Sequence, residues 1–322
     1  MPEKTNLPLF LRENNYEKLS KRPNVTIYTG KGLSFQPIGE GCSSQEEIEL
    51  QGKEIFINYR LYTYYSQYRG IQQSRNVYIS TTLLELDILP KHLIIVGGGY
   101  IGLEFASMYA GFGSKVTLLE AGNRFMPRND SDIAKSVREV MEKKGVEIRL
   151  NVRTQSIHDT HDGVTLTYSD TSDGTPYFVD GDAILIATGR KPMIEGLNLQ
   201  AAGVEVDAHG AIVVNDQLHT NAPHIWAMGD VKGGAQFTYV SLDDFRIIRD
   251  QLFGDKKRDI NDRDPLPYAV FIDPPLAHIG ITEEEALRKG YSFKVSRLPA
   301  TSVVRSRTLQ RLMDAKAIIN TP

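Results

Sequence analysis

The stretch that decides the fold is Leu93-Ile-Ile-Val-Gly-Gly-Gly-Tyr-Ile-Gly-Leu-Glu-Phe-Ala106, followed by Lys115-Val-Thr-Leu-Leu-Glu120. Residues 93–96 are an unbroken apolar run, which is typical of a strand buried on both faces. Residues 100–112 predict a helix, and residues 115–119 predict a second buried strand. Strand, helix and strand in this order predict a βαβ unit with two parallel strands.

The turn between the first strand and the helix has the form G-x-G-x-x-G, with Ala106 one helical turn further on. It consists of Gly97, Gly98, Gly99, Tyr100, Ile101 and Gly102. In such a turn the first glycine permits the tight bend, the second admits a pyrophosphate to the backbone, and the third lets helix and strand pack closely. The helix N-terminus favours the diphosphate. A glycine-rich turn with a structural purpose alone is the alternative.

Glu120 ends the second strand, 23 residues after Gly97. A carboxylate there accepts hydrogen bonds from an adenosine ribose diol and repels a 2′-phosphate. The sequence therefore predicts that NADH is favoured over NADPH.

Further elements extend an α/β pattern. We expect a helix at 132–144, capped by Asp130 or Ser131 and ended by Gly145, and a strand at 146–150. Period-two stretches predict an antiparallel meander. The other expected strands are 25–28, 53–58, 183–186 and 224–228, the meander strands are 154–158, 164–168 and 177–179, and the other expected helices are 239–253 and 283–289.

Composition narrows the function classes. Of 322 residues, 41% are hydrophobic and 24% charged, as in soluble globular proteins. The net charge of −3 gives no support for nucleic acid or an anionic membrane as a partner. Residues 92–113 are apolar, but Glu104 and six glycines argue against a membrane span. Cys42 is the single cysteine, so no internal disulfide or two-thiol mechanism is possible, and a reducing cytoplasm is expected.

Three later segments carry a family resemblance: ATGRKP at 187–192, TNAPHIWAMGD at 220–230 and FIDPPLAHIGITEEEA at 271–286. With the glycine-rich turn, they stand in the order found in the FAD- and NAD(P)-dependent pyridine nucleotide–disulfide oxidoreductases. The sequence resembles that family, which includes dihydrolipoamide, glutathione and mercuric reductases. Residues 240–250 (VSLDDFRIIRD) most resemble its bacterial reactive-chlorine-resistance branch.

The resemblance implies a flavoprotein oxidoreductase that passes hydride from NAD(P)H to FAD and on to a small-molecule acceptor. It implies that Gly189, Gly229 and Asp230 contribute to the FAD site. Tyr100 would cover the isoalloxazine and Glu104 would lie near the flavin, although both side chains could instead face a helix interface. A homodimer is implied for the full-length relative.

The sequence also departs from the family pattern. Relatives carry an earlier G-x-G-x-x-G, a C-x4-C pair and a final His-Pro-x-x-x-Glu, which are missing here. Tyr59-Arg60 stands where relatives have Thr-Gly. We therefore expect an internal segment of a longer reductase, in which the redox dithiol is not encoded and no catalytic residue can be assigned.

The expected fold is a Rossmann-like NAD-binding domain (91–216) inserted in a partial FAD-binding domain (1–90 and 217–262), followed by the start of an α+β interface domain (263–322). Two other functions stay open: a non-catalytic dinucleotide-binding fragment without stable FAD, and an ordinary NAD-dependent dehydrogenase. His158 and His161 could bind a metal, but a solvated hairpin turn between two meander strands is the favoured explanation. The tyrosine- and arginine-rich stretch 59–70 could stack on single-stranded nucleic acid, or form a half-buried strand or loop.

Overall fold

The computed structural model describes residues 6–30, 32, 48–65, 68–299, 302 and 314–320. The chain divides into two compact units. The sheet unit comprises Tyr62–Lys191 and Asn261–Pro322. The α5 unit comprises Met1–Leu61 and Pro192–Ile260. The chain passes between them within β2 (Leu61–Thr63) and β11 (Arg190–Pro192).

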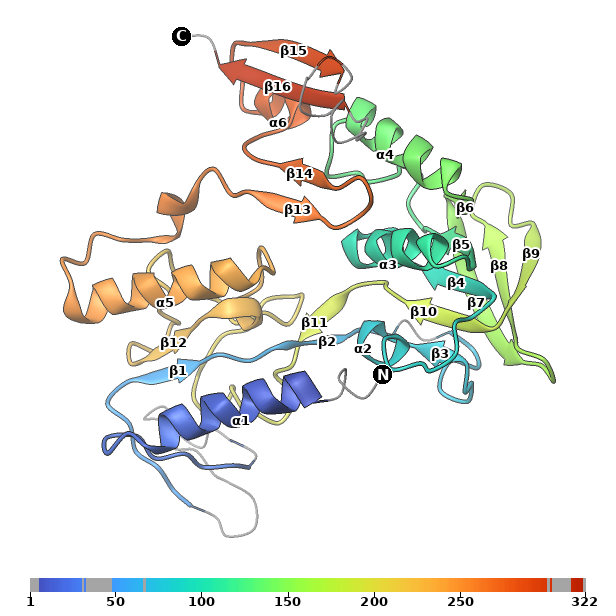
Figure 1. Ribbon diagram of the computed structural model, residues 1–322. Helices are drawn as coiled ribbons and strands as arrows, with labels where there is room; N and C mark the ends of the chain where they lie inside the picture. The colour runs from blue at the N-terminus through green and yellow to red at the C-terminus, as the bar shows by residue number, and fades with distance from the viewer. Residues whose placement is uncertain are drawn as a thin grey trace. The chain divides into compact units, whose positions relative to one another are not determined.

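Five parallel strands form the central sheet of the sheet unit, in the order β3-β10-β4-β5-β6 (Figure 1). Helix α3 (Tyr100–Gly111) joins β4 to β5, and α4 (Ser131–Lys143) joins β5 to β6. The predicted α/β class and both βαβ connections are confirmed. The strands are β3 Val77–Tyr78, β4 His92–Val96, β5 Lys115–Leu119, β6 Val146–Arg149 and β10 Ala183–Ile186; the short helix α2 is Ser80–Leu83.

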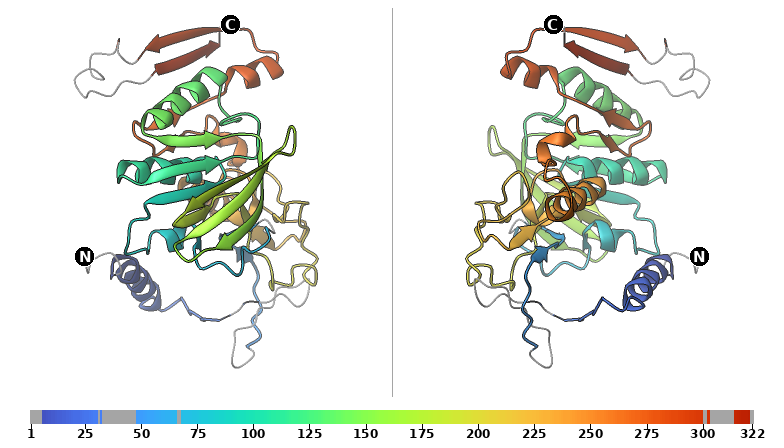
Figure 2. Two further views of the ribbon diagram at one scale, coloured as in Figure 1. Left: turned by 90° about the vertical axis from the view of Figure 1, so that its right-hand side faces the viewer. Right: turned by 90° about the vertical axis from the view of Figure 1, so that its left-hand side faces the viewer.

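The two faces of this sheet are covered differently (Figure 2). Leu93 and Ile95 of β4 pack in one core with residues of α3 and α4. Ile94 and Val96 pack in another core with residues of the meander. All four side chains are buried, and each contributes about 1.5–3 kcal/mol of burial free energy. This two-sided burial is the physical reason for the continuous apolar run in the sequence.

The meander is confirmed as an antiparallel sheet in the order β7-β8-β9. Its strands are β7 Val152–Asp159, β8 Val164–Asp170 and β9 Pro176–Gly181. They are longer than predicted because their alternation of buried and exposed residues continues past the first polar positions. The connection between β7 and β8 is the solvated hairpin expected at His161, where the Nδ1 atom lies 2.7 Å from Asp162 Oδ1 and both side chains are more than 90% exposed.

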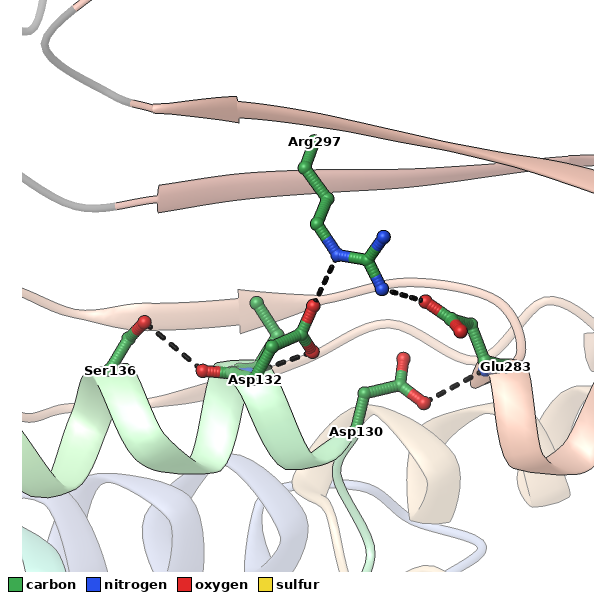
Figure 3. Close-up of polar contacts among 6 residues, drawn as sticks. Asp130, Asp132, Ser136, Glu283 and Arg297 are labelled. Carbon is green, nitrogen blue, oxygen red and sulfur yellow. Dashed lines mark hydrogen bonds and ion pairs between the residues drawn. The ribbon is translucent and has the colours of Figure 1, made fainter.

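The C-terminal part of the sheet unit contains two hairpins and the predicted helix. Its elements are η2 Ile260–Arg263, β13 Tyr268–Val270, β14 Leu276–His278, α6 Glu283–Arg288, β15 Phe293–Pro299 and β16 Asp314–Asn320. Arg297 of β15 donates from Nε to Asp132 Oδ2 and from Nη2 to Glu283 Oε1, both at 2.7 Å (Figure 3). Asp130 Oδ1 accepts the Glu283 N–H at 2.9 Å. These bonds fasten α6 and β15 to the first turn of α4.

The α5 unit is built around a parallel pair, β1 (Ile55–Ile57) and β12 (Ile225–Ala227). The 3-10 helix η1 (Gly229–Lys232) follows β12, and α5 (Thr238–Phe253) follows η1. Trp226 of β12 is buried with Ile247 and Ile248 of α5. The predicted strands 53–58 and 224–228 and the predicted helix 239–253 are confirmed.

Two expectations for the N-terminal region were wrong. Residues 25–28 form no strand, and the helix α1 (Asn6–Ser20) lies where no helix was expected. The described apolar side chains of α1 are about half exposed, from 48% for Leu19 to 57% for Phe10. Because this helix has no apolar stripe of the usual spacing, periodicity did not reveal it. In the described part of the chain, no helix has the length and hydropathy needed to cross a membrane.

Candidate functional site

The glycine-rich turn lies at the end of β4, where two of its glycines are required by close packing. Gly97 has a φ of +111°, and a Cβ there would stand 2.4 Å from the Ala187 carbonyl oxygen at the end of β10. A Cβ at Gly102 would stand 2.0 Å from the Gly97 carbonyl oxygen. The turn is therefore closed against β10, and α3 starts directly above the sheet edge, as the sequence predicted.

Gly99 has a different environment. Its φ of −72° suits any residue, and a Cβ there would meet no atom within 4 Å. It is the N-cap of α3 and lines a cavity. The unpaired N–H groups of a helix N-terminus attract an anion, and the absence of a side chain leaves the backbone approachable. No described residue fills this position, which leaves room for the diphosphate of a dinucleotide. The Ile101 side chain packs against the core of the sheet unit.

Glu120 follows β5, and both of its carboxylate oxygens are held by the backbone. Oε2 accepts the N–H of Gly98 at 2.6 Å, and Oε1 accepts the N–H of Gly122 at 2.7 Å. A Cβ at Gly98 would stand 3.0 Å from Oε2, so the middle glycine of the turn makes room for this contact. The carboxylate is fixed before any ligand arrives, and each oxygen keeps a lone pair for a ribose hydroxyl.

The cavity beside the turn has a volume of about 940 Å³, near the upper end of the usual range for cofactor sites. The meander and two loops complete it. Tyr68 is half-buried against the meander core, and Gln155 Nε2 donates to Ser169 Oγ at 3.0 Å. The residues that line the cavity are Tyr68, Val96, Gly97, Gly99, Leu119, Glu120, Ala121, Val152, Arg153, Thr154, Gln155, Ser169, Ala187, Thr188 and Gly189.

Sequence reasoning missed the wall formed by Tyr68 and the first residues of β7. Alternation along β7 identified a strand but gave no sign of what its exposed side chains face. Gly189, which was expected in the FAD site, lines this cavity with a φ of +125° and open space at its Cβ position. The Tyr64 ring lies beneath Lys191 Nζ at 3.9 Å, so this part of the tyrosine-rich stretch contacts its own unit.

Tyr100, Glu104 and Ser107 lie at helical spacing along α3 and contact the 268–273 segment. The rings of Tyr100 and Tyr268 stack at 5.3 Å. Glu104 Oε1 accepts the Phe271 N–H at 2.9 Å, and Ser107 Oγ accepts an N–H from the same segment at 3.1 Å. These contacts agree with the alternative that Tyr100 and Glu104 face an interface of α3. Their roles beside a flavin stay predictions.

A small polar cluster surrounds Tyr100. Burial, together with a hydrogen bond to Tyr268, raises the pKa of the Tyr100 phenol, so it stays neutral at physiological pH. Asn129 donates from Nδ2 to the Tyr268 hydroxyl at 2.8 Å, and the Tyr268 ring also stacks on His278 at 4.9 Å.

In the α5 unit, the Gly229-Asp230 turn is well anchored. Gly229 has a φ of +72°, and its N–H donates to Asp244 Oδ2 at 2.7 Å. Asp244 is fully buried, and Lys232 Nζ lies 3.5 Å from the same oxygen. A Cβ at Gly229 would stand 2.9 Å from Asn58 Oδ1, so the turn also packs against the end of β1. Asp230 is half-buried at the start of η1. Cys42 lies outside the described residues.

Comparison with known proteins gives a consistent result. Residues 13–244 match the family described as pyridine nucleotide-disulphide oxidoreductase, and residues 266–320 match its dimerisation domain. The chain is 43% identical to the probable pyridine nucleotide-disulfide oxidoreductase RclA of Escherichia coli, over 97% of this chain and 70% of that protein. It is 31% identical to the mitochondrial dihydrolipoyl dehydrogenase of Pisum sativum, over 94% of this chain and 60% of that protein.

A solved structure, titled the Cu(II) complex of HOCl-induced flavoprotein disulfide reductase RclA from Escherichia coli, superposes with a TM-score of 0.92. It is 41% identical and covers 99% of this chain, whereas this chain covers 72% of it. The chain thus spans between about three fifths and three quarters of these relatives.

Substitutions at Gly99 and Gly102 should affect ligand binding and folding stability separately. Gly102→Ala should lower the free energy of unfolding by about 3 kcal/mol, because its Cβ has no space. Gly99→Ala should leave stability within about 1 kcal/mol but weaken NADH binding more than about tenfold, because its Cβ would block the diphosphate. Urea unfolding and calorimetric titration measure the two effects. Undiminished NADH binding by Gly99→Ala would contradict the assignment.

Proposed function

This chain belongs to the pyridine nucleotide-disulphide oxidoreductase family, and on that premise we propose that it forms the NADH-oxidising part of a FAD-dependent oxidoreductase. The family resemblance identified from the sequence is confirmed, as is the oxidoreductase class. Members of this family use FAD and NAD(P)H, so family membership argues against an ordinary NAD-dependent dehydrogenase. A non-catalytic dinucleotide-binding fragment has no observation of its own in its favour.

The observation that carries the proposal is the arrangement of Glu120, Gly99 and the start of α3 around one cavity. Gly99 and the helix N-terminus would hold the diphosphate, and Glu120 would hold the adenosine ribose. When bound, the dinucleotide would supply a hydride for transfer to a flavin. The residues of the cavity bind and orient the dinucleotide and take no part in bond making.

We also propose a FAD site, a homodimer, a cellular compartment and a class of electron acceptor for this protein. Gly229 and Asp230 would hold the ribitol side of FAD, from a turn whose position is set by Asp244 and Lys232. The match of residues 266–320 to a dimerisation domain supports a homodimer. The single cysteine supports a reducing compartment such as the cytoplasm. We propose a small-molecule electron acceptor, and the Cu(II) complex of the E. coli relative makes Cu(II) one acceptor to test.

The unaltered chain should bind NADH more tightly than NADPH, because the Glu120 carboxylate accepts a ribose diol and repels a 2′-phosphate. Glu120→Ala should narrow the ratio of the two dissociation constants by roughly tenfold. Isothermal titration calorimetry with both nucleotides measures the ratio. Glu139→Ala, an exposed carboxylate on α4 outside the cavity, is the matched control. Tighter binding of NADPH than of NADH would refute the preference.

This 322-residue chain should bind FAD weakly. The sequence contains one G-x-G-x-x-G motif, which builds the cavity described above, and Tyr59-Arg60 replaces the small pair that relatives carry beside the flavin. Gel filtration followed by flavin absorbance measures retention. Stoichiometric yellow protein after gel filtration would show that the remaining contacts are sufficient.

NADH oxidation by this chain should be independent of thiols, since Cys42 has no second cysteine and is flanked by Glu40, Glu46 and Glu47 rather than cations. With added flavin, quinone or Cu(II) as acceptor, the rate should be unchanged in Cys42→Ser. Parallel assays with oxidised glutathione and lipoamide should show no turnover. A disulfide-reductase activity that disappears in Cys42→Ser would overturn this prediction.

A further inference from the structure

Two of the residues that line the cavity carry a charged side chain, Glu120 and Arg153. Resting on the proposed NADH function of this cavity, we infer that Arg153 is its second specificity-determining residue. Its guanidinium is the cation that meets a 2′-phosphate on the adenosine ribose. It thereby sets the residual affinity of the chain for NADPH, against the repulsion exerted by Glu120.

Backbone pairing places Arg153 at the ribose end of the cavity. The Glu120 N–H donates to the Arg149 carbonyl at 2.8 Å, and the Val152 N–H donates to the Glu120 carbonyl at 3.1 Å. The segment 149–152 therefore runs directly beside the residue that would hold the ribose. Arg153 is the next residue along β7, and it shares the cavity wall with Glu120.

The neighbouring arginines are engaged elsewhere. Arg124, which follows β5, lies with its Nη2 atom 3.4 Å from Glu284 Oε2. Arg149 pairs with Glu147, two residues earlier on the same strand β6. Neither residue lines the cavity. The exposed Arg153 side chain forms no ion pair or side-chain hydrogen bond within the described ranges 6–30, 48–65 and 68–299.

NADPH differs from NADH in one group, the 2′-phosphate, and Glu120 and Arg153 act on that group in opposite directions. A 2′-phosphate brings negative charge that the Glu120 carboxylate repels and the Arg153 guanidinium attracts, through a charge-assisted hydrogen bond. The ribose diol of NADH lacks that charge. Loss of Arg153 should therefore affect NADPH and leave NADH nearly untouched. A residue that contacts the diphosphate or adenine would affect both nucleotides equally, because these groups are common to them.

The experiment titrates NADH and NADPH calorimetrically into the full chain and its variants at one fixed ionic strength. Arg153→Ala should weaken NADPH binding by roughly tenfold and change NADH binding by less than about twofold. Arg153→Lys should retain part of the NADPH affinity, because the charge remains without the planar fork. Arg149→Ala, the paired arginine outside the cavity, should change neither constant.

A Glu120→Gln background makes the NADPH affinity measurable even where repulsion keeps it low. There NADPH binding should tighten, and adding Arg153→Ala should abolish most of that gain. If Arg153→Ala weakened the binding of both nucleotides equally, or changed the binding of neither, the inference would be overturned. The proposed function would still be upheld by NADH binding to the unaltered chain. Failure of the unaltered chain to bind either nucleotide would overturn the proposed function, and the inference with it.

Discussion

The close approach of the Gly97 turn to the Ala187 carbonyl is the contact on which the cavity beside the turn depends. A side chain at Gly97 would stand 2.4 Å from that oxygen, and one at Gly102 would stand 2.0 Å from the Gly97 carbonyl. Because both positions lack a Cβ, α3 begins at the carboxyl edge of the sheet, where open parallel sheets bind their ligands. Glu120 and Gly189 lie at the same edge, after β5 and β10, the two strands that flank β4.

The polar groups of the cavity are held in place before binding. Backbone N–H groups on both sides fix the Glu120 carboxylate, so the proposed binding of a ribose would cost no side-chain freedom there. Helix α3 also contacts the C-terminal segment of the sheet unit. Tyr100, Glu104 and Ser107 of α3 contact residues 268–273, so the helix that opens the cavity also carries the start of the region that matches a dimerisation domain.

The Gly229 turn in the α5 unit is organised by a buried charge pair. Asp244 is inaccessible to solvent, and it is satisfied by the Gly229 N–H and by Lys232. The desolvation penalty of burying two charges can exceed the free energy gained from their attraction, so a buried ion pair is weak evidence for stability. Here the pair holds the backbone of Gly229, which has a positive φ. Gly229 and Asp230 are the two residues that the family resemblance places at the flavin.

The sequence by itself determined the βαβ units, the meander and the glycine-rich turn. Apolar runs, alternation and glycine positions depend on residues close together in the chain, which constrain each other's backbone directly. It did not reveal α1, whose apolar residues follow no helical stripe. Only the tertiary structure placed Arg153 and Tyr68 around the same cavity as Glu120, and Glu104 against Phe271. These pairs are far apart in sequence, and their meeting depends on how the meander and the C-terminal hairpin pack on the sheet, which no local pattern encodes.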